Sequence, residues 1–240
     1  MSSAVKVVGI SIGIISVSYA LRRLALRNLT TSTSSSTPKK SGVYTRTGDK
    51  GSSSLYNGER RLKSDPVYEA LGHQDELNCV LGIAREHCLS IPQNDILTTK
   101  LEDIQSQLFD IGAAIATPAS KSSINKLQYT EFSSFFTIQL EKWIDELDDK
   151  LPPLQFFVIP SGGMACSHLN LARAVCRRTE RAVVPLIENK EVHAEVGRYL
   201  NRLSDFLFVA ARTAAVLDGK KEVLWKKQQP PKEEEEKKKE

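Results

Sequence analysis

Two separated segments of the 240-residue chain carry residue types that could bind a polyphosphate. The first, residues 43–54, combines two glycines, which let the backbone approach a ligand, with hydroxyl groups and cations. Those that could contact phosphate oxygens are Thr45, Arg46, Thr47, Lys50, Ser53 and Ser54. The second, residues 173–181, would stack Arg173, Arg177 and Arg181 on one helix face, because they lie four residues apart. Stacked like charges repel, so this row is unfavourable without an anionic partner.

Each segment also has an ordinary structural interpretation. The first lacks the G-x-x-x-x-G-K-[ST] pattern of a P-loop, and no clear strand pattern precedes it, so it could be only a polar loop before a helix. The arginine row could be a solvated or salt-bridged helix face. An RNA-binding surface fits it less well, because no aromatic residues alternate with the arginines to stack on bases.

A small-residue face is expected on the first helix of the body. Gly72, Asp75, Cys79 and Gly82 follow one another at steps of three, four and three residues. Small side chains there would let another helix approach closely, and Asp75 would then need a cationic partner. The alternative is that Asp75 is an exposed surface charge.

Polar and aromatic residues near the arginine helix could serve the same site. Asn201 and Asp205 would share a face of the last long helix, where Asn201 could meet a phosphate or a hydrated cation and Asp205 could orient an arginine. Ordinary hydrogen bonds between helices would also explain both residues. Phe156 and Phe157 are by default core aromatics.

The first 41 residues have the composition of a targeting leader. No Asp or Glu occurs before Asp49, whereas six Lys and Arg residues lie in residues 1–41 and residues 30–37 are all Ser or Thr. This composition predicts a mitochondrial transit peptide and import into the matrix. The alternative comes from residues 7–20, an apolar run of about 14 residues, shorter than the roughly 20 that span a bilayer, which could be a secretory segment or a membrane anchor.

Charge outside the leader gives no indication of nucleic-acid binding. The chain has 33 Lys and Arg against 29 Asp and Glu, and the leader holds six basic and no acidic residues, so the remainder carries 27 against 29, a net charge of −2. The overall pI of 8.8 therefore does not argue for an RNA or DNA partner. Residues 226–240 contain only Lys, Glu, Gln and Pro and predict a disordered charged tail.

The cysteines suggest neither a zinc site nor a disulfide framework. Cys79, Cys88, Cys166 and Cys176 include no C-x-x-C pair, and the four histidines are scattered. We expect reduced, buried thiols and no metal site built from protein side chains alone.

Apolar residues at helical spacing dominate the body of the chain. Asp65 followed by Pro66 predicts the start of a first helix, with Asp65 as its N-cap. Four more helices are expected at about residues 94–116, 130–151, 161–184 and 192–217. Pro152 and Pro153 would end the third, and Pro185 would end or kink the fourth.

These helices predict an all-α five-helix bundle, because no convincing alternating strands accompany them. The bundle would occupy residues 65–218 behind a nucleotide-binding loop at residues 43–64, in one domain at residues 42–225. The apolar run at residues 154–159 is too short to assign to a strand or an extended segment.

Several short motifs occur in a characteristic order and spacing. They are YTRTGDKG at residues 44–51, GERR at 58–61, DELN at 75–78, PSGG at 160–163, the arginine row at 173–181 and LNRLSD at 200–205. In this order and spacing the chain resembles the PduO-type ATP:cob(I)alamin adenosyltransferases, and the resemblance covers about residues 43–227. Arg46 stands where Lys is also common in that family, and Thr179 where Ala is frequent.

The resemblance implies a homotrimer of five-helix bundles. ATP would lie at subunit interfaces, between the N-terminal loop of one chain and the arginine helix of its neighbour. Asp75 would pair with Arg173 across that interface, and Arg177 and Phe157 would also serve the reaction. The implied ATP site consists of Thr45, Arg46, Thr47, Gly48, Ser53, Ser54, Lys63, Arg177, Arg178, Thr179, Glu180, Arg181 and Asn201.

The implied reaction joins the adenosyl group of ATP to cobalt. Cobalt(I) of reduced cobalamin attacks the 5′ carbon of ATP, which yields adenosylcobalamin and releases triphosphate. Because cobalt(I) is itself a strong nucleophile, the protein would position the substrates, stabilise the triphosphate with arginine and Mg²⁺, and make cobalt(II) reducible. Phe157 matches the aromatic that acts as an apolar wedge in place of the lower axial ligand.

The implied use of the product is delivery to methylmalonyl-CoA mutase. A non-catalytic cobalamin carrier that delivers the cofactor to this mutase, with ATP as a regulator, is the alternative function. A weaker alternative is a membrane-associated adaptor bundle anchored through residues 7–20.

Overall fold

The computed structural model describes residue 41 and residues 43–228, in two units that divide after Arg46. The predicted leader, apart from Ser41, lies outside the described residues, and so does the predicted tail beyond residue 228. Among the described residues, no helix is long and apolar enough to cross a membrane.

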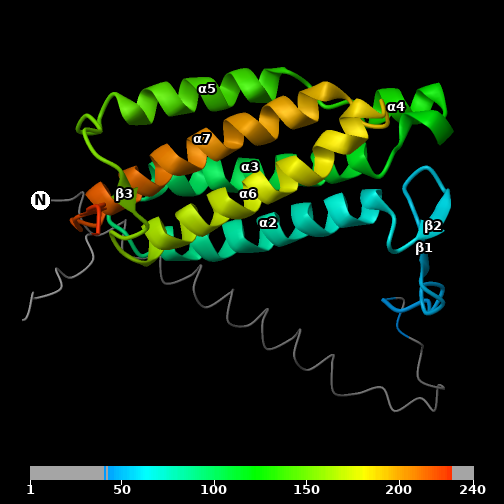
Figure 1. The fold of residues 1–240 in the computed structure, drawn as a ribbon, viewed down its shortest axis with the longest axis horizontal. Coiled ribbons are helices and arrows are strands. Elements are labelled where there is room, and N and C mark those ends of the chain that lie inside the picture. The colour runs from blue at the N-terminus through cyan, green and yellow to red at the C-terminus, as the bar shows by residue number, and fades with distance from the viewer. Residues whose placement is uncertain (1–40, 42, 229–240) are drawn as a thin grey trace, which may run out of the picture. The chain divides into compact units, whose positions relative to one another are not determined.

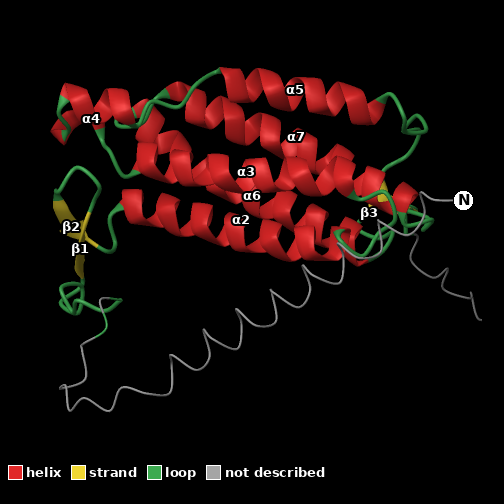
Figure 2. Ribbon diagram, turned by 180° about the vertical axis from the view of Figure 1, so that it is seen from behind, coloured by secondary structure: helices red, strands yellow, loops and turns green. Residues whose placement is uncertain are grey.

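Five long helices form the second unit (Figures 1 and 2). They are α2 (Pro66–Cys88), α3 (Asp95–Ile115), α5 (Phe135–Asp148), α6 (Met164–Glu188) and α7 (Ala194–Leu217). α6 packs against both α2 and α7, while α3 packs on α2 and α5 packs on α7. The predicted all-α five-helix bundle is confirmed.

The helical spacing of apolar residues builds the core. The inner face of α7 carries residues that have no exposed surface, and these residues recur every three or four positions as an amphipathic helix requires. They are Leu200, Leu203, Leu207, Ala210 and Ala214. The matching seam of α3 is equally buried and consists of Leu101, Ile104, Leu108, Ile111 and Ile115.

α2 begins where the sequence predicts. The Asp65 carboxylate accepts a hydrogen bond from the backbone N–H of Val67 at 2.9 Å, and Pro66 occupies the first turn. This cap satisfies a donor that the helix itself cannot pair.

The predicted start of the third long helix at residue 130 is wrong. α5 begins at Phe135, and Thr130 instead ends a short helix, α4 (Ile124–Tyr129), where its hydroxyl donates to the carbonyl of Lys126 at 3.0 Å. A 3₁₀ turn at Ala119–Lys121 precedes α4, so the segment between α3 and α5 is partly helical. Phe132 lies in the connecting segment between α4 and α5 and is buried, with its ring in an edge-to-face contact with Tyr199.

Pro185 does not end α6, which continues to Glu188. A proline removes one backbone donor, and so close to the C-terminus the remaining turn still forms. The carbonyl of Pro185 accepts a hydrogen bond from the N–H of Asn189 at 3.1 Å, which closes the helix.

Two short antiparallel strand pairs accompany the helices, at opposite ends of the bundle (Figure 1). β1 (Ser52–Ser54) pairs with β2 (Arg60–Leu62) before α2. β3 (Val158–Ile159) pairs with β4 (Val223–Leu224), so the unassigned run at residues 154–159 ends in a strand.

The four cysteines are free thiols, and three of them are buried. Cys79 is exposed, which contradicts the expectation that all four are buried. Its helix face, the small-residue face of α2, is not covered by another element of the described chain at Gly72, where a Cβ would meet no atom within 4 Å.

Candidate functional site

The hairpin formed by β1 and β2 holds most of the predicted nucleotide loop. Ser52 pairs with Leu62, Ser53 with Arg61 and Ser54 with Arg60. The strands are short, and their turn closes through a hydrogen bond from the N–H of Leu55 to the carbonyl of Glu59 at 2.8 Å. Leu55 is buried and anchors this turn, while Ser53 is half-buried and Ser54 is exposed.

Arg60 fastens the loop that precedes the hairpin. Its guanidinium donates to the carbonyl of Thr47 at 2.9 Å and to the carbonyl and hydroxyl of Ser52 at 3.3 and 2.8 Å. A further hydrogen bond reaches the hydroxyl of Ser54 at 3.2 Å. The sequence motif at residues 58–61 includes Arg60, but its spacing gave no sign that this arginine would face the protein's own loop.

Gly48 and Lys63 lie side by side. A Cβ on Gly48 would come within 3.3 Å of the Lys63 ammonium, so glycine leaves the room that this side chain occupies. Gly51 has a φ of +78°, and hydrogen bonds join its N–H to the carbonyl of Gly48 at 3.2 Å and its carbonyl to the N–H of Lys63 at 2.9 Å. The left-handed φ favours glycine at position 51, whereas the space occupied by Lys63 favours glycine at position 48.

Thr45 and Arg46 belong to the other unit. There the Arg46 guanidinium lies 5.5 Å from the centroid of the Tyr44 ring, in a cation–π contact, and Arg46 has a φ of 59°.

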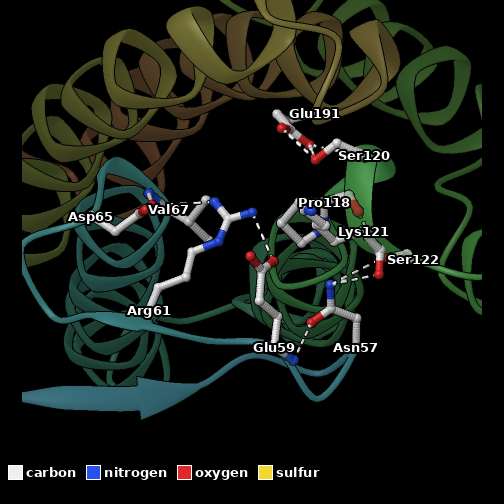
Figure 3. Close-up of polar contacts among 10 residues, drawn as sticks. All are labelled: Asn57, Glu59, Arg61, Asp65, Val67, Pro118, Ser120, Lys121, Ser122 and Glu191. Atoms are coloured by element: carbon white, nitrogen blue, oxygen red, sulfur yellow. Dashed lines mark hydrogen bonds and ion pairs between the residues drawn. The ribbon is translucent and has the colours of Figure 1, made fainter.

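The hairpin is attached to one end of the helical bundle by polar contacts (Figure 3). The amide of Asn57 donates to the Ser122 hydroxyl at 3.2 Å, and Arg61 pairs with Glu59 at 2.8 Å and with Asp65 at 3.5 Å. The hydrogen bond from Arg61 is the main reason that the pKa of Glu59 is lowered. The N-cap of α2 is thereby joined to the hairpin.

The arginine row of α6 has a different character. Arg177 and Arg181 are exposed, and neither forms an ion pair or hydrogen bond with another side chain in the part of the chain that the structure describes. Arg173 is half-buried; its guanidinium lies 5.9 Å from the Phe208 ring, and its buried Nε has no hydrogen-bond partner among the residues that the structure describes. Arg178 is instead paired with Glu76 of α2. Two cations of the row are therefore free to meet an anion.

Glu180 and Asn201 meet across α6 and α7. The amide nitrogen of Asn201 donates to the Glu180 carboxylate at 2.9 Å, which brings two predicted site residues together. Asp205 does not orient an arginine of α6, because it pairs with Arg202 of its own helix at 2.8 Å.

Thr179 needs a correction as a nucleotide-binding residue. Its side chain has no exposed surface and lies in the contact between α6 and α2, where the hydroxyl is 3.0 Å from the carbonyl of His73 and 3.1 Å from that of Val175. Thr179 is two residues from both Arg177 and Arg181, and a two-residue step on a helix leads to a different face. Thr179 therefore faces inward while the two arginines face outward. We therefore assign it to helix packing.

Asp75 is exposed on α2, and no ion pair joins it to Arg173 within the described residues. Phe157 is 78% exposed, contrary to its default interpretation as a core aromatic, and Phe156 is 60% exposed. Phe157 directly precedes β3, at the end of the bundle opposite the hairpin (Figure 1). A single chain therefore does not bring the hairpin and Phe157 together.

Comparisons with known proteins agree on one family. The family model described as cobalamin adenosyltransferase matches residues 43–214. The corrinoid adenosyltransferase MMAB of Mus musculus is 46% identical over 195 residues, 81% of this chain and 80% of the relative. That of Homo sapiens is 47% identical over 192 residues, 80% of this chain and 76% of the relative.

Solved structures support the same assignment. A variant of a PduO-type ATP:corrinoid adenosyltransferase from Lactobacillus reuteri, complexed with cobalamin and ATP, superposes with a TM-score of 0.70. It is 34% identical, and the match covers 77% of this chain and 99% of that chain. The resemblance first seen in the motifs is thereby confirmed, and the chain belongs to the cobalamin adenosyltransferase family.

Proposed function

We propose that this protein transfers the 5′-deoxyadenosyl group of ATP to the cobalt of reduced cob(I)alamin. The cobalt–carbon bond of adenosylcobalamin forms as the bond between the 5′ carbon and its oxygen breaks, and triphosphate leaves with the bonding electron pair. The observation that carries the proposal is the pair of exposed guanidinium groups of Arg177 and Arg181, which have no ion-pair or hydrogen-bond partner within the described part of a chain of this family. Their charge suits a leaving triphosphate.

The nucleotide site would combine the loop and the α6 face. The loop contributes Thr45, Arg46, Thr47 and Gly48, and the hairpin contributes Ser53, Ser54 and Lys63. Arg177, Arg178, Arg181, Glu180 and Asn201 form the other wall. Arg60 holds the loop in shape through its contacts with Thr47 and Ser52, so it acts on ATP binding without touching ATP.

Mg²⁺ would be held chiefly by the nucleotide. Among the described residues, no group of three or more His, Cys, Asp or Glu side chains could hold a metal ion. Mg²⁺ commonly binds through substrate phosphates, waters and one or two carboxylates, a set that the Glu180 carboxylate and the Asn201 amide oxygen could complete. When bound, the ion would neutralise charge on the triphosphate.

Phe157 would serve the corrinoid. Cobalt(II) without its lower axial ligand is more easily reduced, and an exposed aromatic ring can fill that position without coordinating the metal. The 78% exposure of Phe157 supports this role, because a core aromatic would be unavailable to a substrate.

A homotrimer would complete the site. Three features of one chain support an assembly. Asp75 and Gly72 are exposed on the small-residue face of α2, and Arg173 Nε is buried with no hydrogen-bond partner among the described residues. The hairpin and β3 lie at opposite ends of the bundle (Figure 1). Asp75 and Arg173 of neighbouring subunits would pair. Light scattering should give a trimer mass for the wild type and a smaller mass for Asp75→Arg; a monomeric wild type would contradict the assembly.

The leader composition supports mitochondrial import, and the product would pass to methylmalonyl-CoA mutase. A fusion of residues 1–41 to a fluorescent protein should reach the mitochondrial matrix. Retention of the fusion in a membrane would contradict this localisation. Transfer should appear as mutase activation by product-loaded enzyme that exceeds activation by the same concentration of free adenosylcobalamin.

The decisive experiment is an anaerobic assay with ATP, Mg²⁺ and chemically reduced cobalamin. Formation of the adenosylcobalamin absorption spectrum with an equal amount of triphosphate is expected. Tight cobalamin binding without product would contradict the proposal and favour a carrier.

A further inference from the structure

The exposed ring of Phe157 has one aromatic neighbour among the described residues, Trp225. The two ring centroids lie 6.4 Å apart with an angle of 87° between planes, an edge-to-face contact. The backbone N–H of Trp225 also donates to the carbonyl of Phe157 at 2.8 Å. Trp225 follows α7 and β4, so this contact joins the C-terminal segment to the residue proposed to meet the corrinoid.

Strand pairing fixes the two residues relative to one another. β3 and β4 pair Val158 with Leu224 and Ile159 with Val223. The Ser161 hydroxyl donates to the carbonyl of Ile159 at 2.7 Å and accepts from the N–H of Val223 at 2.8 Å. One side chain thus connects both strands, which sets their register and keeps Trp225 beside Phe157.

The start of this ribbon is attached to α7. Glu222 pairs with Arg212 at 3.4 Å, and Arg212, which is only 5% exposed, also donates to the carbonyl of Pro152 at 2.8 Å. A cavity of about 440 Å³, lined in part by Phe156, Val158 and Leu224, lies against the ribbon. Because packing there is incomplete, the position of Phe157 depends on strand hydrogen bonds and on the Trp225 ring.

We propose that Trp225 is a positioning residue that holds the Phe157 ring in place for the corrinoid, an inference that rests on the proposed function. An edge contact restricts rotation of the Phe157 ring but leaves most of its surface free, as the 78% exposure requires. Displacing a group in an active site by about 1 Å can lower the rate roughly 10²-fold. Trp225 therefore acts through Phe157 and need not touch the reacting atoms.

The test compares Trp225→Ala with Trp225→Phe in the full chain. The alanine variant keeps the backbone hydrogen bond to Phe157 and removes only the ring, whereas phenylalanine restores a ring. With ATP, cob(II)alamin and an added one-electron reductant that produces cob(I)alamin, we expect Trp225→Ala to lower kcat about 10-fold, within the range for a misplaced group, with an unchanged KM for ATP. The fraction of bound cob(II)alamin without its lower axial ligand, read from absorption and electron paramagnetic resonance spectra, should fall in parallel, and Trp225→Phe should recover most of both.

Trp143→Phe is the matched control, because Trp143 is the only other tryptophan and lies on α5 against Phe206. It should leave the cobalt spectrum and kcat unchanged. A Trp225→Ala enzyme with the wild-type cobalt spectrum would overturn the inference while leaving the adenosyltransferase function intact. A wild type that makes no adenosylcobalamin would overturn the function and, with it, the inference.

Discussion

The polar side chains on the two faces of α6 differ in whether they are hydrogen-bonded within the described chain. On the inner face, Thr179 is hydrogen-bonded to two carbonyls and the Cys176 thiol to the carbonyl of Leu200 at 3.2 Å. On the outer face, Arg177 and Arg181 have no ion-pair or hydrogen-bond partner among the described residues. Buried polar groups need hydrogen-bond partners inside the protein, whereas exposed cations are solvated and can stay unpaired until a ligand binds. The comparison separates residues that hold the helix from residues that serve its substrate.

The largest effect should come from the outer face. Arg177→Ala should lower kcat/KM roughly 10²–10³-fold, the cost of losing one stabilising group for developing charge, because the triphosphate loses its counter-charge. Its free energy of unfolding should change by less than about 0.5 kcal/mol, since Arg177 loses no ion pair or hydrogen bond to the described residues. Turnover assays and urea denaturation measure the two quantities. Arg202→Ala, which removes an arginine outside the proposed nucleotide site, is the control for turnover. Wild-type turnover by Arg177→Ala would contradict the proposed role of Arg177.

The inner face should respond to alkaline pH. Burial raises the pKa of the Cys166 thiol from 9.0 to about 11. Because the folded protein holds this proton more tightly, the contribution to stability is complete below pH 9 and is lost as the pH rises to 11. The loss should be on the order of 2 kcal/mol.

Urea denaturation from pH 8 to 11 should show a shallower decline for Cys166→Ala than for the wild type. Cys79→Ala, which changes an exposed thiol, should decline in parallel with the wild type. Parallel curves for all three proteins would mean that Cys166 titrates normally.

Thr179→Val tests the correction made for that residue. The substitution keeps the shape and removes the hydroxyl, so it should lower the free energy of unfolding by about 1 kcal/mol. The KM for ATP should stay within twofold of the wild type if Thr179 only packs α6 on α2. A large rise in this KM with unchanged stability would return Thr179 to the nucleotide site.

A small effect on stability is also expected for Arg178, which lies between the two faces. Its ion pair with Glu76 is partly exposed, and such pairs contribute about 0–1 kcal/mol. Arg178→Ala should therefore change the unfolding free energy by no more than Glu76→Ala does, and it should lower kcat/KM far less than Arg177→Ala. Equal losses of activity in the two arginine variants would end the distinction between paired and unpaired cations.

Much of the fold was predictable because the helices follow from the local periodicity of apolar residues. Apolar residues every three or four positions located α2, α3 and α7 closely, and Asp65 with Pro66 marked the start of α2. The failures have local causes too. Thr130 ends α4 instead of starting α5, and Pro185 lies so near the end of α6 that its missing donor costs little.

The candidate site was predictable as a set of residues but not as a set of contacts. The motifs identified the loop, the arginine row and the positions of Glu180 and Asn201. In the structure the Asn201 amide nitrogen lies 2.9 Å from the Glu180 carboxylate. Arg60 was not selected, since its importance comes from folding back onto Thr47 and Ser52. Thr179 was included in the ATP site that the resemblance implies, although the helix turns it inward.

The sequence by itself determined the family, the helices and the spacing of the cations, since each depends on residues within a few turns of one another. Only the tertiary structure decided which cations remain unpaired, because Arg178 meets Glu76 across 102 positions of the chain. It also decided that Trp225 meets Phe157, through strands too short to be recognised without their partners. Local periodicity follows from backbone geometry, whereas pairing between distant residues is fixed only when the chain packs.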